Sequence, residues 1–127
     1  MFKRKKNKFN AVKTLAHGRL WSSKLELKVY EMLLMMERGG KFSEIKCQVH
    51  CRFKTEDHGK IIMIPDFSAV DNATGKMVYI EAKGFPTASW KRKKKAWAIN
   101  GPGILYVYGG SYKSPLLIET IVPKTLE

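Results

Sequence analysis

The chain has 127 residues, which suffices for one domain with a single hydrophobic core that needs neither disulfides nor a structural metal. Its 24 Lys and Arg residues against 11 Asp and Glu give a net charge of +13, which favours a polyanionic partner, DNA before a membrane surface. No apolar run approaches the ~18 residues of a membrane span, so a helical membrane protein is excluded and a cytoplasmic protein is expected.

Residues 1–20 are predicted to form a basic, flexible N-terminal arm, and residues 21–127 a single domain. The first residues have no helical or strand period, and residues 3–13 contain no acid. We interpret the arm's cations as DNA phosphate contacts, with a solubilising or localising tail as the alternative. These cations are Lys3, Arg4, Lys5, Lys6 and Lys8.

A first helix is predicted from Ser22 or Ser23 to about Arg38, where two glycines follow. One apolar stripe marks its buried face: Trp21, Leu25, Val29, Met32, Leu33 and Met36. A second strip, Leu27, Tyr30 and Leu34, leaves a homodimer contact open.

Glu26 falls at the edge of the buried stripe, and its spacing fits two roles. Ser23 and Glu26 form a capping box, in which the carboxylate accepts the Ser23 backbone N–H. Alternatively, the Glu26 carboxylate points toward the carboxylates described below and helps to hold a metal.

Strands are predicted over Phe42–Phe53 and Lys60–Val70. Cys47 and Cys51 stand near His50, but a structural zinc needs four ligands and no second Cys/His pair is suitably spaced. We therefore interpret both cysteines as free thiols.

A β-hairpin from Ile64 to Lys83 carries the candidate active site. A turn centred between Ala73 and Thr74 would set Asp66 opposite Glu81, with their Cβ atoms about 4.5–5.5 Å apart. Two carboxylates at that spacing repel each other unless a cation lies between them. Lys83 follows on the same face, because side chains alternate along a strand.

A second helix should begin after Thr87 or Ser89 and end before Gly101. Trp90 and Trp97 are expected to dock it onto the sheet. Its five consecutive cations surround the helix, which favours a phosphate-gripping surface over a plain solvated face. They are Lys91, Arg92, Lys93, Lys94 and Lys95.

The apolar segment Ile104–Tyr108 is typical of a buried strand, often parallel to its neighbour. A strand, a helix and another strand predict a crossover unit. The fold class is therefore α/β, with a central mixed β-sheet flanked by helices in the order α-β-β-β-α-β.

The chain resembles the PD-(D/E)XK nuclease superfamily from about Trp21 to Tyr108. The motifs are Pro65-Asp66, the later Glu81-Ala82-Lys83, Glu26 on the preceding helix and the basic helix that follows. Within the superfamily, the chain is most similar to small phage-type nucleases, including the endonuclease I type of Holliday-junction resolvase. The resemblance implies a restriction-endonuclease-like core and, if the chain is phage-encoded, the host cytoplasm.

The expected activity is a divalent-metal-dependent DNA endonuclease, an enzyme that hydrolyses phosphodiester bonds and selects junction or branched DNA, as in DNA recombination. Mg²⁺, with Mn²⁺ as a substitute, would be held by Asp66, Glu81 and the backbone carbonyl of Ala82, with Glu26 as a further candidate. Lys83 would orient or deprotonate the attacking water, or neutralise the phosphate. The alternatives are a nicking or site-specific endonuclease of the same superfamily and a non-catalytic DNA-binding protein on the same fold.

Overall fold

The computed structural model describes residues 14–54 and 59–126. A hairpin precedes the first helix, and a separate ribbon and the central sheet follow it. The elements are β1 (Thr14–Ala16), β2 (Arg19–Trp21), α1 (Lys24–Arg38), β3 (Phe42–Cys47), β4 (Cys51–Lys54), β5 (Lys60–Met63), β6 (Phe67–Asp71), β7 (Lys76–Ala82), α2 (Ala88–Asn100), β8 (Leu105–Gly109), β9 (Leu116–Ile121) and a 3₁₀ turn, η1 (Lys124–Leu126).

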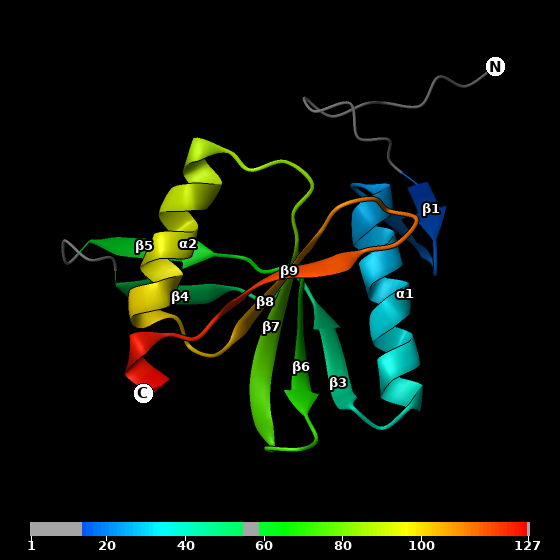
Figure 1. Ribbon diagram of the computed structural model, residues 1–127, viewed down its shortest axis with the longest axis horizontal. Coiled ribbons are helices and arrows are strands. Elements are labelled where there is room, and N and C mark those ends of the chain that lie inside the picture. The colour runs from blue at the N-terminus through cyan, green and yellow to red at the C-terminus, as the bar shows by residue number, and fades with distance from the viewer. Residues whose placement is uncertain (1–13, 55–58, 127) are drawn as a thin grey trace.

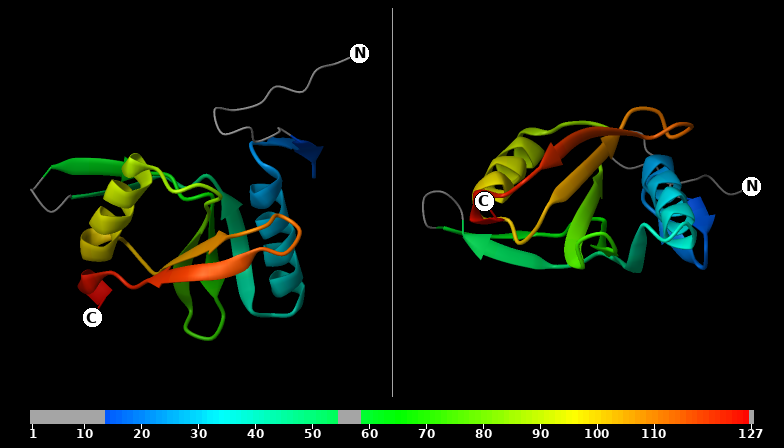
Figure 2. Two further views of the ribbon diagram at one scale, coloured as in Figure 1. Left: turned by 45° about the horizontal axis from the view of Figure 1, so that its top comes forward. Right: turned by 60° about the horizontal axis from the view of Figure 1, so that its bottom comes forward.

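The central sheet has five strands in the order β3-β6-β7-β8-β9. β7 and β8 are parallel, as expected for a crossover through α2, and the other neighbours are antiparallel. The two helices lie on opposite sides of this sheet (Figures 1 and 2). The predicted α/β class with a mixed sheet flanked by helices is therefore confirmed, and β9 adds an edge strand to the predicted order.

Both helices begin at the predicted caps. The Ser23 hydroxyl accepts the Glu26 backbone N–H at 3.0 Å, and the Thr87 hydroxyl accepts that of Trp90 at 3.1 Å. Each bond satisfies one of the N–H groups that a helix start leaves unpaired. Two helix positions are thereby fixed next to the end of β7.

Two hydrophobic cores lie on the two faces of the sheet. The first joins the predicted stripe of α1 to β3, β6 and β7, and its members include Trp21, Val29, Leu33, Phe67 and Ile80. The second joins α2 to the other face and to the ribbon. Its buried members are Cys51, Met63, Tyr79, Trp90, Trp97, Leu105, Val107 and Ile121.

The predicted strands Phe42–Phe53 and Lys60–Val70 were wrong in extent, because each is broken in two. Gln48 donates its backbone N–H to the Asp66 backbone carbonyl, which continues the β3–β6 pairing, but its φ of 58° leaves the extended conformation and ends β3. Pro65 has no N–H for a strand ladder and separates β5 from β6. The freed segments β4 and β5 form an antiparallel ribbon that packs on α2 (Figure 1).

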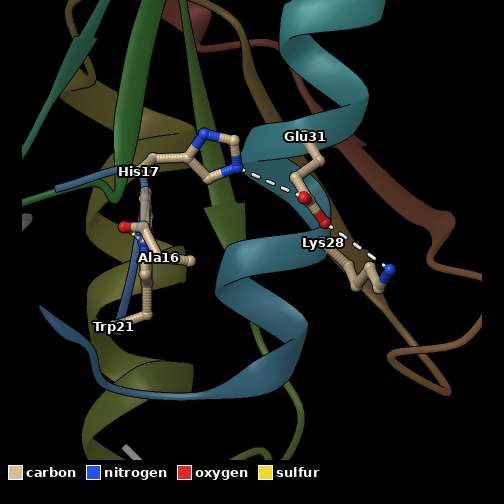
Figure 3. Close-up of polar contacts among 5 residues, drawn as sticks. All are labelled: Ala16, His17, Trp21, Lys28 and Glu31. Atoms are coloured by element: carbon tan, nitrogen blue, oxygen red, sulfur yellow. Dashed lines mark hydrogen bonds and ion pairs between the residues drawn. The ribbon is translucent and has the colours of Figure 1, made fainter. Parts of the chain in front are cut away.

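Within the described residues, regular structure is present before the predicted domain boundary at residue 21. Residues 14–21 form the β1–β2 hairpin, and the Trp21 indole N–H donates to the Ala16 carbonyl at 2.9 Å. Figure 3 shows His17 reaching Glu31 of α1 at 3.2 Å, while Lys28 pairs with the same carboxylate at 3.5 Å. The hairpin is thus attached to α1, and residues 1–13 lie outside the described residues.

Three other expectations concern the dimer strip, the cysteines and membrane spans. Leu27 and Tyr30 pack against the first core, so most of the strip proposed as a dimer contact is used within the chain. Cys47 and Cys51 are free thiols, as predicted. No helix within residues 14–54 and 59–126 is long and apolar enough to cross a membrane.

Candidate active site

The β6–β7 register is the one predicted from the turn. Phe67 pairs with Ile80 and Ala69 with Val78, so the same register places Asp66 opposite Glu81. The Asp66 Oδ2 atom accepts the backbone N–H of Ala82 at 2.8 Å, which fixes this carboxylate at the end of β7. The two acids therefore meet where β7 ends and the connection to α2 begins.

Glu81 is an unusually buried carboxyl group. Its side chain faces the α2 side of the sheet, and the residue is only 7% exposed. Burial raises the pKa of Glu81 most, and a hydrogen bond and charge repulsion from Asp66 raise it further; Lys83 opposes the shift. A cation bound between the two carboxyl groups would favour their charged forms and oppose this shift.

Glu26 approaches this pair from the start of α1. It is 6% exposed, its carboxylate accepts a hydrogen bond from the Ser22 hydroxyl, and burial followed by the charge of Asp66 raises its pKa. Ser23 caps the helix through the Glu26 backbone, while the Glu26 side chain faces the acids. The Ser23 hydroxyl half of the capping box is therefore present, while the Glu26 carboxylate bonds to Ser22 beside the site, and its role as a metal ligand stays a prediction.

Lys83 is held from two sides. Its backbone N–H donates to the Tyr108 carbonyl at 2.8 Å, which continues the parallel β7–β8 pairing. Its Nζ atom lies 5.0 Å from the centroid of the Trp90 ring, within the range of a cation–π contact. Trp90 is itself buried in the second core, so α2 positions the ammonium group beside the acids.

An open cavity of about 970 Å³ connects these side chains. Asp66, Glu81, Lys83 and Glu26 all line it, and so does Lys93 of the basic helix. The remaining walls come from the start of α1, the end of β5, the β7–α2 connection and the β8–β9 loop. Four segments far apart in the sequence thus meet at the predicted site.

Whether this cavity can hold a metal ion depends on its carboxylates. Among the described residues, no three His, Cys, Asp or Glu side chains form a group that could hold a metal ion by themselves. Mg²⁺ does not need such a cage, because it is bound through one or two carboxylates and keeps several waters for exchange with phosphate. Asp66, Glu81 and the Ala82 carbonyl are compatible with that mode, and the repulsion between the two acids gives a cation a favourable position.

The cations of α2 have different surroundings. Lys93 lines the cavity, whereas Lys94 forms an ion pair with Glu119 of β9 at 3.2 Å. Lys91, Arg92 and Lys95 are exposed. The cations proposed in the arm, Lys3 to Lys8, lie outside the part of the chain that the structure describes.

Sequence reasoning missed several residues of the cavity wall. Lys24, Phe85 and Tyr112 all line it, the last from the β8–β9 loop. Of these residues, only Phe85 could have been expected near the site, because it follows Glu81 by four residues. Tyr112 reaches the site because β8 lies parallel to β7, and no local pattern predicts that contact.

Comparison with known proteins gives one relationship. None of the curated proteins matches this chain. A family model described as "Protein of unknown function (DUF1064)" matches residues 6–108, which include α1, the whole β6–β7 hairpin and α2. The four candidate site residues lie within that range, and the chain belongs to this family.

Proposed function

We propose that this protein is a divalent-metal-dependent DNA endonuclease of the PD-(D/E)XK type. The observation that carries the proposal is the contact of the buried Glu81 with Asp66, with Lys83 in the same cavity. Surface ion pairs on a solvated strand would leave these groups exposed and contribute little stability. A buried carboxyl group beside a second acid costs stability, and a cation that binds there during function would explain why it is retained.

Each site residue has a separate role in the proposed phosphodiester hydrolysis. When bound, Mg²⁺ supplies Lewis-acid activation of the phosphate and a water of lowered pKa. Asp66 and Glu81 would hold that ion, and the Ala82 N–H keeps the Asp66 carboxylate oriented toward the end of β7. Lys83 would orient the attacking water or neutralise the phosphate, and Trp90 restricts the positions that its ammonium group can take.

The positive charge supports DNA as the substrate. The net charge of +13 opposes close packing of the chain on itself and favours binding to a polyanion. Lys93 places one α2 cation in the cavity, and the exposed Lys91, Arg92 and Lys95 extend the positive surface along the helix. Recognition of DNA shape and backbone follows from this arrangement better than a long sequence code.

The test is cleavage of plasmid, linear duplex, single strand, flap and four-way junction in Mg²⁺, Mn²⁺ or EDTA. Metal-dependent cleavage that is lost in Asp66→Asn and in Lys83→Ala supports the proposal. Lys76→Ala is a matched control for Lys83→Ala, because Lys76 is exposed at the other end of β7. DNA that is bound but remains uncut in both metals would instead indicate a non-catalytic DNA-binding protein.

The cleavage products show whether one or both strands are cut, and this indicates whether the enzyme acts as a dimer. Symmetrical cutting of both strands of a four-way junction needs two active sites related by a two-fold axis. We therefore expect a homodimer on junction DNA if the enzyme is a resolvase, measured by light scattering with and without DNA. A monomer that leaves single nicks would point to the nicking alternative.

A further inference from the structure

The exposed aromatic side chains of the described chain are confined to one place. Among the Phe, Tyr and Trp residues within 14–54 and 59–126, only Phe85 and Tyr112 are exposed, at 60% and 38%. Both line the cavity that contains Asp66 and Glu81. A single exposed apolar residue is ordinary, but this coincidence of both with the site needs an explanation.

The same cavity wall has further exposed apolar groups. Ile62 and Ile64, at the end of β5 and just after it, are 51% and 40% exposed and also line the cavity. Neither a phosphate group nor a metal ion is bound by hydrocarbon or aromatic surface. The cavity therefore contains a surface for a part of the substrate other than its backbone.

Cations stand among these apolar groups. The Lys24 Nζ atom lies 5.1 Å from the centroid of the Tyr112 ring, and Lys93 and Lys83 line the same cavity. A positively charged groove with aromatic side chains is the arrangement by which proteins bind single-stranded nucleic acid. The cations follow the backbone, and the rings stack on the bases.

We propose that Phe85 and Tyr112 stack on unpaired bases of the DNA whose phosphate lies at the Asp66–Glu81 pair. In a continuous duplex each base is already stacked on its neighbours, so its face is not available to either ring. The preferred substrate class is then DNA with unpaired nucleotides near the cut, such as single strands, flaps or branch points. This inference rests on the proposed function, since it takes DNA as the ligand of the site.

The first test measures binding by fluorescence anisotropy, with Asp66→Asn as the background so that the DNA stays intact in Mg²⁺. The probes are a labelled single strand, the same strand in a duplex, and the same strand with abasic positions. We expect single strand to bind more tightly than duplex or abasic strand. Phe85→Ala and Tyr112→Ala should each weaken single-strand binding about tenfold and duplex binding less than twofold.

Two conservative variants separate stacking from general apolar contact. Phe85→Leu keeps an apolar side chain without a π face and should bind like Phe85→Ala, whereas Phe85→Trp should retain binding. Met77→Ala is the control, because Met77 is an exposed apolar residue, 44% exposed, outside the cavity wall. Since Phe85 is mostly exposed, its replacement should leave the fold intact.

The abasic strand gives the decisive comparison. If Phe85 acts through bases, Phe85→Ala weakens binding of the normal strand but has no further effect on the abasic strand, as in a double-mutant cycle. Equal losses on both strands, or equal binding of single strand and duplex, would overturn the inference.

Cleavage assays with protein that retains Asp66 distinguish a failure of this inference from a failure of the proposed function. Cleavage of duplex and unpaired DNA at equal rates, unchanged by Phe85→Ala, rejects base stacking and retains the nuclease. Binding to unpaired DNA that depends on Phe85, without any cleavage in Mg²⁺ or Mn²⁺, retains base stacking and rejects the nuclease.

Discussion

The two faces of the β6–β7 pair are both buried, but they differ in chemistry. Away from the turn, the face toward α1 has apolar side chains, Phe67, Ala69, Val78 and Ile80, all within the first core. The face toward α2 has Asp66, Ser68, Tyr79 and Glu81, and three of these are less than 9% exposed. One face stabilises the fold, while the other retains groups that are costly to bury, which is the reason that we propose it as the functional face.

The largest expected effect comes from removing the buried acid of the α2-facing side. Glu81→Gln keeps the shape of the side chain but removes a proposed metal ligand, so we expect cleavage to fall about a thousandfold or more. The same change should raise the melting temperature in EDTA at alkaline pH, because an amide cannot become a buried negative charge beside Asp66. Cleavage rates and thermal unfolding measure the two effects.

Glu119→Gln is the control for this variant, since Glu119 is a partly exposed acid that pairs with Lys94. It should change neither quantity by much. A Glu81→Gln protein that is less stable in EDTA at alkaline pH would contradict the view that this acid is retained at the expense of stability.

A truncation on the α1-facing side should affect stability and not the chemistry of the site. Leu33 is fully buried in the first core, and Leu33→Ala should lower the free energy of unfolding by about 2–5 kcal/mol. Met35→Ala, on the 67% exposed neighbour two residues along α1, should change it by less than about 0.5 kcal/mol. Urea unfolding measures both, and equal losses would mean that the described packing of α1 is incorrect.

The pH dependence of stability should come from the acids at the site. The folded-state pKa of Glu81 is raised from 4.5 to about 10, and that of Glu26 is also raised, both chiefly by burial. Groups with a raised folded-state pKa stabilise the protein fully below their unfolded pKa and lose that contribution as pH rises toward the folded value. In EDTA, stability should therefore fall as pH rises from about 4.5 toward about 10.

Glu81→Gln should make this dependence shallower, and so should Mg²⁺ added to the unaltered protein, because a bound cation replaces the proton. Urea unfolding at several pH values gives the comparison. A stability that rises with pH over this range would show that the buried acids are not the controlling groups.

The smallest expected effect is at Ser68. Its hydroxyl is buried on the α2-facing side and, within the described residues, has no hydrogen-bond partner. Ser68→Ala removes this unsatisfied group and leaves no partner behind, so stability should stay the same or increase by about 1 kcal/mol. A loss above about 1 kcal/mol would indicate a hydrogen bond to the Ser68 hydroxyl in solution.

The sequence predicts features set by nearby residues better than features set by distant ones. The turn and strand alternation correctly gave the β6–β7 register, and caps and stripes gave both helices. Alternation shows which residues share a face, but it does not show what covers that face. The burial of Glu81 depends on α2, which packs back onto the sheet through Trp90 and Trp97.

The same limit explains the errors. The break at Gln48 follows from its left-handed backbone conformation, and the break at Pro65 follows from a missing donor, although the proline could have been recognised as a strand end. Tyr112 and Lys24 join the cavity only through the tertiary fold. The proposed catalytic residues were therefore accessible from sequence, whereas the residues proposed to contact bases were not.

The tight turn after β6 has a consequence for how the molecule folds. The Asp71 carbonyl accepts the Gly75 backbone N–H at 2.7 Å, and its carboxylate accepts that of Ala73 at 2.9 Å. Because these contacts are local, we expect the hairpin to form early, while Asp66 and Glu81 are still hydrated. Desolvation of the acids then comes late, when α2 docks, so a bound cation should slow unfolding more than it speeds folding.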